Sequence, residues 1–129
     1  MNKERFAIAY IADAGFVMPT CVSITSLLEN QGEEEYDIYV LVNGVTEDEK
    51  RIILGLERIG AKINIIDITS ENYAGLDENT CIGWNLHITR TALFKFGLAE
   101  YLHWEDKILY IDGDTIIVNN ISDLCRTEL

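Results

Sequence analysis

The chain has 129 residues, enough for one domain with a sizeable core and too few for a second complete domain. Hydrophobic residues make up 48% of it and charged residues 25%, with 1 proline, which excludes collagenous, disordered and disulfide-scaffold proteins. Lys and Arg number 10 against 22 Asp and Glu, so a formal net charge of -12 makes nucleic acid and anionic lipid poor partners. A phosphorylated ligand would need a local cation, and a divalent metal ion is the simplest one.

Cysteine usage and hydropathy favour the cytoplasm. Cys21, Cys81 and Cys125 are far apart and form no CxxC pair, which argues against a disulfide framework and against a zinc site. The first apolar run lacks the features of a secretory leader, and no apolar stretch approaches the roughly 20 residues of a membrane span. We therefore expect a cytoplasmic protein or, at full length, one at the periphery of the inner membrane.

The first part of the chain predicts a strand followed by a helix. Residues 6–12 (FAIAYIA) are typical of a strand buried on both faces. Pro19 is expected to open the helix, which ends near Asn30. Its apolar stripe consists of Cys21, Val22, Ile24, Leu27 and Leu28. The acidic run of residues 33–35 that follows is interpreted as a solvated corner.

A second strand and helix follow at similar spacing. The strand covers residues 36–43 (YDIYVLVN), and Gly44 marks the turn after it. Thr46 and Glu49 form a capping box, and Gly60 stands where a helix C-cap belongs. The expected apolar face of this helix consists of Ile52, Ile53, Leu56 and Ile59.

The remaining pattern predicts a doubly wound α/β fold. Residues 62–68 form a third strand, residues 69–85 a long and therefore functional loop, residues 89–103 a third helix and residues 107–112 a fourth strand. Strands that alternate with helices at these lengths pair in parallel through right-handed crossovers, with helices on both faces of the sheet. Ligands of such sheets bind beyond the carboxyl ends of the strands, at the switch point.

Carboxylates follow two of the predicted strands at this edge. Asp13 follows the first strand, and Asp112 and Asp114 follow the fourth. In an extended segment residues two apart point to the same side, and Gly113 would leave the point between them open. Mg²⁺ and Mn²⁺ take oxygen ligands of this kind together with substrate phosphates. Such a pair can also lie on a solvated turn, but the apolar run at 116–118 favours a fixed position, where the carboxylates would repel each other without a cation.

The segment at 106–124 (DKILYIDGDTIIVNNISDL) resembles the motif of the retaining glycosyltransferases of family 8, which include glycogenin and bacterial lipopolysaccharide galactosyl- and glucosyltransferases. Three further stretches match in family order, namely IAYIADAGFVMPTCVSITSLLEN, DIYVLVNGVTEDEKRIILGL and TALFKFGLAEYLHWEDK. The resemblance implies a Rossmann-like nucleotide-diphosphosugar transferase fold, of which residues 1–129 would be the N-terminal, nucleotide-sugar-binding part. Family members continue into residues that hold the sugar, the acceptor and the far side of the metal, so we expect a C-terminally truncated chain.

The resemblance also implies how the donor phosphates are held. Mn²⁺, or Mg²⁺, would bridge Asp112, Asp114 and the diphosphate of a UDP-sugar, with Gly113 between the two ligands. Lys95 stands where family members have a cation that touches the phosphates, and Arg90 is the substitute candidate. The resemblance identifies no catalytic residue within the chain.

The nucleoside would bind the loop after the first strand. The resemblance implies that Ile11 and Asp13 line this part of the site, with Asp13 in contact with the uracil or ribose and Phe16 stacked on the base. Alternatively Asp13 only caps a turn and Phe16 belongs to the core. Gly15 replaces a polar residue of many family members, so one ribose hydrogen bond would be missing.

The implied activity is transfer of a hexose from a UDP-sugar to a glycan or sugar acceptor with retention, as in lipopolysaccharide biosynthesis. A first alternative is a UDP- and metal-binding module without catalysis, because the acceptor half is absent. A second is an unrelated doubly wound domain that uses Asp13 and the Asp pair as a phosphotransfer cluster. We further expect an exposed sheet edge and apolar helix faces to favour self-association.

Overall fold

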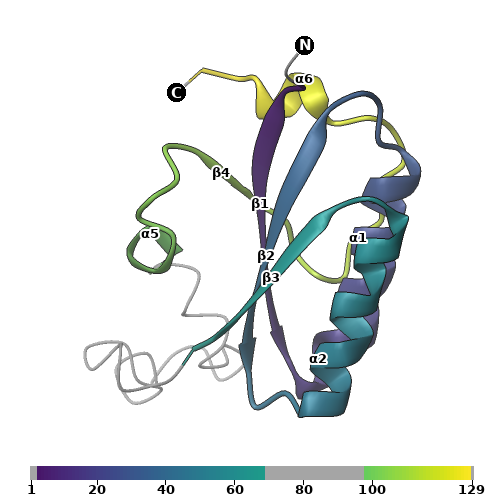
Figure 1. Cartoon of the computed structure of the whole chain (residues 1–129), viewed down its shortest axis with the longest axis vertical. Coiled ribbons are helices and arrows are strands. Elements are labelled where there is room, and N and C mark those ends of the chain that lie inside the picture. Colours follow the sequence, from purple (N-terminus) through teal and green to yellow (C-terminus); the bar gives the residue numbers. More distant parts are fainter. Residues whose placement is uncertain (1–2, 69–97, 129) are drawn as a thin grey trace, which may run out of the picture.

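The computed structural model describes residues 3–68 and 98–128, in which four parallel strands form one sheet (Figure 1). The strand order is β3-β2-β1-β4, and helices lie on both faces of the sheet. This confirms the predicted α/β layout. The strands are β1 (Arg5–Asp13), β2 (Glu35–Asn43), β3 (Lys62–Asp67) and β4 (Ile108–Tyr110).

The order of the strands places a switch point beside β1. β1 pairs with β2 along its whole length, from Arg5 opposite Glu35 to Asp13 opposite Asn43. The chain moves outward from β1 through β2 to β3, and then returns to place β4 on the other side of β1. The direction of winding therefore reverses between β1 and β4, which is where open α/β sheets bind their ligands.

Two helices cover one face of the sheet, α1 (Val17–Glu29) and α2 (Glu47–Leu54). A single 3₁₀ turn, η1 (Ala14–Phe16), precedes α1, which begins at Val17 rather than at the predicted Pro19. Proline is tolerated there because the N–H groups of a first turn have no partner within the helix. α2 begins with the predicted capping box: the Glu49 N–H donates to the Thr46 hydroxyl at 3.2 Å, and the Thr46 N–H donates to the Glu49 carboxylate at 3.0 Å.

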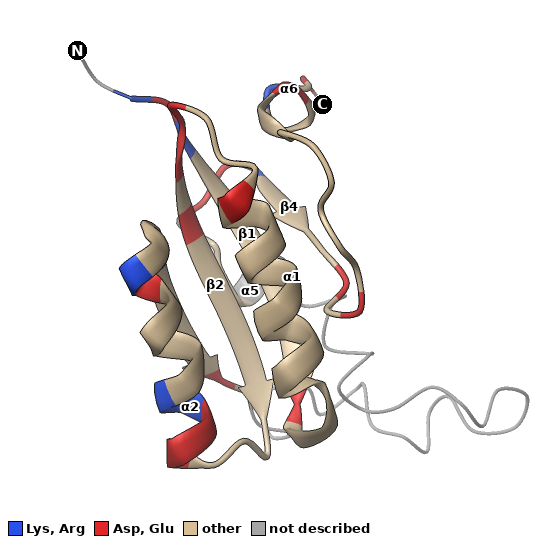
Figure 2. Ribbon diagram, turned by 90° about the vertical axis from the view of Figure 1, so that its right-hand side faces the viewer, with Lys and Arg blue, Asp and Glu red and all other residues tan. Residues whose placement is uncertain are grey.

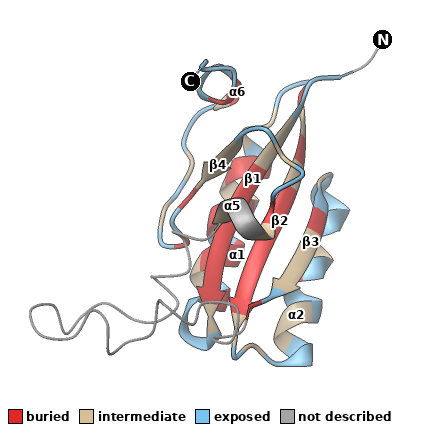
Figure 3. Cartoon of the chain, turned by 90° about the vertical axis from the view of Figure 1, so that its left-hand side faces the viewer, coloured by how far each residue is buried: buried red, intermediate tan, exposed pale blue. Residues whose placement is uncertain are grey.

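Side chains of the two central strands alternate between two cores. Ile8 and Tyr10 of β1 face α1 and α2, whereas Ala9 and Ile11 face the short helix α5 (Leu98–Tyr101). Figure 3 shows that burial is concentrated in β1 and β2, the strands with neighbours on both sides. Their apolar sequences follow from this double burial.

Three apolar positions that were predicted to face the core lie at the surface. Val22 of α1 and Ile52 of α2 are each 50% exposed, and Ile59 is 41% exposed. Ile59 belongs to the 3₁₀ helix η2 (Gly55–Ile59). A 3₁₀ helix has about three residues per turn, so the α-helical period of about 3.6 residues no longer predicts which side of the helix Ile59 occupies. Gly60 ends this helix as predicted, with a φ of +116°.

The chain that leaves β4 crosses onto α1. β4 ends at Tyr110 instead of continuing to residue 112, although the Ile111 N–H still donates to the Ala9 carbonyl at 2.9 Å. The segment between β4 and the short helix α6 (Ser122–Cys125) then lies beside α1, on the side away from α2 (Figure 2). Within the predicted apolar run at 116–118 only Ile117 packs against the core, and its neighbours are exposed.

Several predictions lie outside the described residues, namely the loop at 69–85, residues 89–97 of the third helix, and with them Lys95 and Arg90. The end of that helix is present as α5. In the described ranges, no helix is both long and apolar enough to cross a membrane.

Glu34 corrects the interpretation of residues 33–35 as a solvated corner. Its side chain is buried and accepts hydrogen bonds from the Tyr36 hydroxyl at 2.7 Å and from Asn120 Nδ2 at 2.6 Å. The Gly32 N–H donates to the same carboxylate. Burial alone would raise the pKa of Glu34, but these hydrogen bonds outweigh it and lower the pKa to about 2. The carboxylate thereby ties the segment that leaves β4 to the start of β2.

Glu34→Gln should change the response of the protein to acid. The carboxylate has a lower pKa in the folded protein than its ordinary value of 4.5, so its stabilising effect is present near neutral pH and is lost as the pH falls from about 4.5 toward about 2. The free energy of unfolding, measured with urea across this range, should therefore fall more steeply for the wild type than for the Gln variant. Glu33→Gln, at an exposed neighbour, is the matched control; a slope shared by wild type and Glu34→Gln would contradict the assignment.

Candidate functional site

The switch point brings together carboxylates from both ends of the chain. Asp13 is the last residue of β1, and Asp112 and Asp114 follow β4, which pairs directly with β1. Because parallel strands end at the same edge of the sheet, all three residues lie at its carboxyl edge. Figure 2 shows acidic residues at the turn where the chain leaves β4 and passes to α1.

The Asp pair, Asp112 and Asp114, lies on a turn rather than on the predicted extended segment. Both aspartates are exposed, and Gly113 between them is buried. The Thr115 hydroxyl closes the turn by donating to the Asp112 carbonyl at 2.7 Å. The carboxylates are thus accessible to a ligand while the backbone that carries them is held from the opposite side.

Gly113 has a different role from the predicted one. A Cβ atom at this position would lie 2.5 Å from the Thr20 hydroxyl oxygen of α1, closer than real Cβ contacts. Glycine therefore allows the turn to approach the helix, and it does not act by leaving space in front of the carboxylates. Thr20 is fully buried, and its hydroxyl has no hydrogen-bond partner within the described part of the chain.

Tyr110 is a site residue that the sequence analysis missed. Burial raises the pKa of its phenol above the usual value, and the nearby carboxylates of Asp112 and Asp114 raise it further. The phenol therefore keeps its proton at neutral pH.

The three residues expected to hold a nucleoside differ in their surroundings. Asp13 Oδ1 accepts a hydrogen bond from the Gly15 N–H at 3.0 Å and so caps η1, which was one of the two interpretations. Phe16 is 44% exposed, so it is not a core residue, and its ring is accessible at the start of α1. Ile11 is buried in the core on the α5 side.

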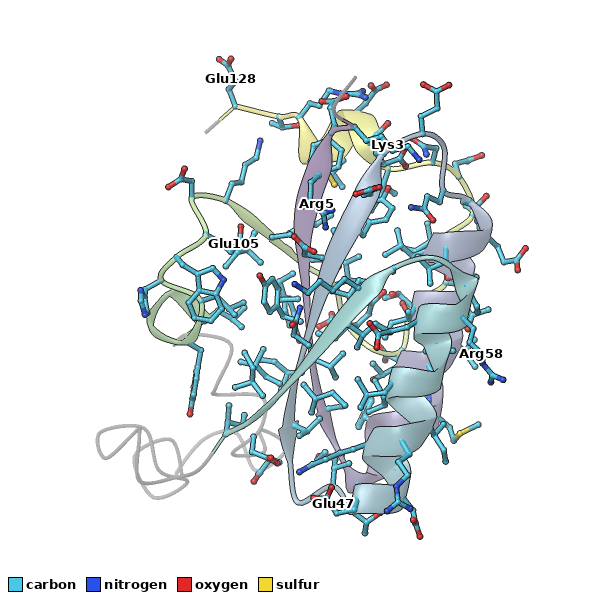
Figure 4. All side chains as sticks on the ribbon, viewed as in Figure 1. Lys3, Arg5, Glu47, Arg58, Glu105 and Glu128 are labelled. Carbon is cyan, nitrogen blue, oxygen red and sulfur yellow. The ribbon has the colours of Figure 1, made fainter. Side chains whose placement is uncertain are left out.

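Salt bridges in residues 3–68 and 98–128 are formed away from the Asp pair. Arg126 pairs with Glu4 at 2.6 Å, at the end of β1 opposite to Asp13, and Lys50 pairs with Asp67 at 2.7 Å. Among the labelled side chains of Figure 4, Arg58 and Glu47 lie at the periphery, on the side of α2. In the same ranges no group of three or more His, Cys, Asp or Glu residues could hold a metal ion.

Comparisons with known sequences identify one family. The sequence model of Glycosyl transferase family 8 matches residues 7–129. Glycosyltransferase GlyA of Streptococcus pneumoniae serotype 4 is 25% identical over 130 residues, which cover 99% of this chain and 17% of that protein. Lipopolysaccharide 1,3-galactosyltransferase of Salmonella typhimurium is 26% identical over 125 residues, which cover 95% of this chain and 35% of that protein. The chain thus spans well under half the length of these curated relatives.

Solved structures agree with the sequence comparison. The galactosyltransferase LgtC, crystallised in complex with donor and acceptor sugar analogues, matches with a TM-score of 0.79 and 27% identity, over 95% of this chain and 43% of that chain. The glycosyltransferase GlyE of Streptococcus pneumoniae matches in fold, with a TM-score of 0.66 and 21% identity, over 98% of this chain and 28% of that chain.

Gly113→Ala should destabilise the protein, and Thr20→Ala should relieve the effect. The added methyl group collides with the Thr20 hydroxyl, and overpacking of this kind costs about 1 to 3 kcal/mol. In Gly113→Ala with Thr20→Ala, the atom at 2.5 Å is gone and the next contacts, at 3.6 and 3.7 Å, are ordinary. Thermal unfolding should therefore show non-additive effects, with the double variant more stable than Gly113→Ala. Additive losses would mean that Thr20 is not the obstacle.

Proposed function

Because this chain belongs to glycosyltransferase family 8, we propose that it is the donor-binding part of an enzyme that transfers a hexose from a UDP-sugar to a glycan or sugar acceptor with retention. Its parallel sheet with helices on both faces is the Rossmann-like GT-A fold of such enzymes. The observation that carries the proposal is the exposed Asp pair at the switch point, beside the end of β1. The family match favours this function over a phosphotransfer cluster.

Asp112 and Asp114 are assigned as ligands of Mn²⁺ or Mg²⁺. Two exposed carboxylates on a turn with a fixed backbone provide the hard oxygen donors that these ions take, and the diphosphate would supply further ligands. A cation also offsets the repulsion between a -12 chain and a diphosphate. When bound, such an ion acts as a Lewis acid that stabilises negative charge on the departing UDP.

The remaining site residues hold the donor in place. Phe16 offers an accessible ring on which the uracil can stack, and Asp13 is fixed by its bond to the Gly15 N–H for contact with the ribose or base. Lys95 is the proposed phosphate contact, with Arg90 as its substitute.

The names of the relatives support a surface glycan as the acceptor. One is a lipopolysaccharide 1,3-galactosyltransferase, and LgtC was crystallised with donor and acceptor sugar analogues. We therefore assign a hexose such as galactose as the transferred sugar and lipopolysaccharide biosynthesis as the setting, in the cytoplasm or at the inner membrane surface. A chain that binds UDP with Mn²⁺ but neither hydrolyses nor transfers the sugar of UDP-hexoses would instead be a binding module.

Asp114→Asn should weaken Mn²⁺ binding by at least about tenfold, because it removes one of two charged ligands. Isothermal titration calorimetry with MnCl₂ measures the affinity. Asp48→Asn is the matched control, since it removes the same charge from an exposed site on α2. Equal Mn²⁺ affinities for the wild type, Asp114→Asn and Asp48→Asn would remove the metal site from this proposal.

UDP binding should depend on the same ion. The acidic chain repels a diphosphate, so a chelator should reduce UDP affinity, and uridine, which carries no phosphate, should be insensitive to it. Titrations of both ligands with Mn²⁺ and with EDTA give the comparison. A UDP affinity unchanged by EDTA would show that backbone donors or a cation such as Lys95 suffice.

A further inference from the structure

Three hydroxyl groups connect the centre of the sheet to the Asp pair. Tyr10 of β1 and Ser23 of α1 are both fully buried, and their side-chain oxygens lie 2.9 Å apart. Ser23 Oγ lies 3.2 Å from the hydroxyl oxygen of Thr115, which follows the Asp pair directly. The Thr115 hydroxyl lies 2.7 Å from the carbonyl oxygen of Asp112. The hydroxyls thus form one continuous chain of hydrogen bonds, which ends on the backbone of the first aspartate.

The acceptor at the end of this series of hydrogen bonds, the Asp112 carbonyl, sets the direction of donation along it. A carbonyl oxygen only accepts, so the one hydroxyl proton of Thr115 is donated to the Asp112 carbonyl. Thr115 therefore accepts from Ser23, and Ser23, whose proton is used in that bond, accepts from Tyr10. Burial raises the pKa of Tyr10 to about 12, so the phenol that begins the chain is protonated at neutral pH. Hydrogen bonds aligned in one direction polarise and strengthen one another.

We propose that Tyr10, Ser23 and Thr115 are positioning residues that set the backbone of the Asp pair relative to β1 and α1. The proposal rests on the proposed function, since it assigns these hydroxyls to the geometry of the metal ligands. The exposed Asp112 and Asp114 side chains have little packing to hold them, so their position depends on the turn that carries them. Thr115 closes that turn and, through Ser23, links it to Tyr10 in the central strand β1.

Thr115→Val tests the series of hydrogen bonds, because valine has nearly the same shape as threonine but cannot donate a hydrogen bond. The loss of one net hydrogen bond at the turn should weaken Mn²⁺ binding about fivefold, whereas Thr115→Ser, which keeps the hydroxyl, should restore it. Thr25→Val is the matched control: it also removes a half-buried threonine hydroxyl, but one that donates to Cys21 O within α1. Ser23→Ala should resemble Thr115→Val, and the two together should be less than additive because they interrupt the same chain.

The amide resonances of Gly113 and Asp114 provide a second measurement that needs no metal. In ¹⁵N NMR spectra of the metal-free protein, Thr115→Val and Ser23→Ala should shift or broaden these signals, whereas Thr115→Ser and Thr25→Val should leave them near their wild-type positions. If the wild type binds no Mn²⁺, the proposed function fails and these spectra alone decide the inference. Unchanged turn signals, or equal Mn²⁺ affinities for Thr115→Val and Thr25→Val, would overturn it.

Discussion

The backbone that carries the Asp pair has left the sheet, yet its buried polar groups still need hydrogen-bond partners. Side chains of α1 supply them. The Ile117 N–H donates to Ser26 Oγ at 2.8 Å, and the Ile117 carbonyl accepts from Asn30 Nδ2 at 2.9 Å, so α1 satisfies both groups of this residue as a neighbouring strand would. Ser23 contacts Thr115 one step closer to the pair. The placement of the site therefore depends on one face of a helix as much as on the sheet.

In the Asp pair the backbone is held by hydrogen bonds while the carboxylates stay exposed, and electrostatics favours this arrangement. An acidic chain that buried Asp112 and Asp114 would have to lower their repulsion with hydrogen bonds, as it does for Glu34, whose carboxylate accepts from Tyr36 and Asn120. Such bonds would occupy the oxygens that a metal ion needs. In the Asp pair the hydrogen bonds go mainly to the backbone, and the carboxylates stay exposed. In the proposed function, a divalent cation would offset the repulsion that remains.

The sequence predicted the elements and the sheet edge at which the three carboxylates lie, because these depend on local patterns. Apolar runs identified the strands, and the capping box at Thr46 identified α2. The polar contacts of α1 escaped prediction, since Ser23 within an amphipathic helix is ordinarily a solvated residue and only its tertiary neighbours show that it is buried. The space that Gly113 leaves for Thr20 likewise depends on how closely two separate segments approach. The third helix and Lys95 lie largely outside the described residues, so their predictions stay untested by the structure.

α1 links the two halves of the site. Asp13 and Phe16 precede it directly in the chain through η1, and the Asp pair is attached to it through the side chains that contact Thr115 and Ile117. A nucleoside diphosphate has a limited span between its base and its phosphates, so residues that bind the two ends must keep a set separation. Asp13 is also the last residue of β1, and the Asp pair follows β4, which pairs with β1, so the sheet and α1 together hold both sets of residues. In the proposed function, these shared contacts would preorganise the two sets of residues for one ligand that spans them.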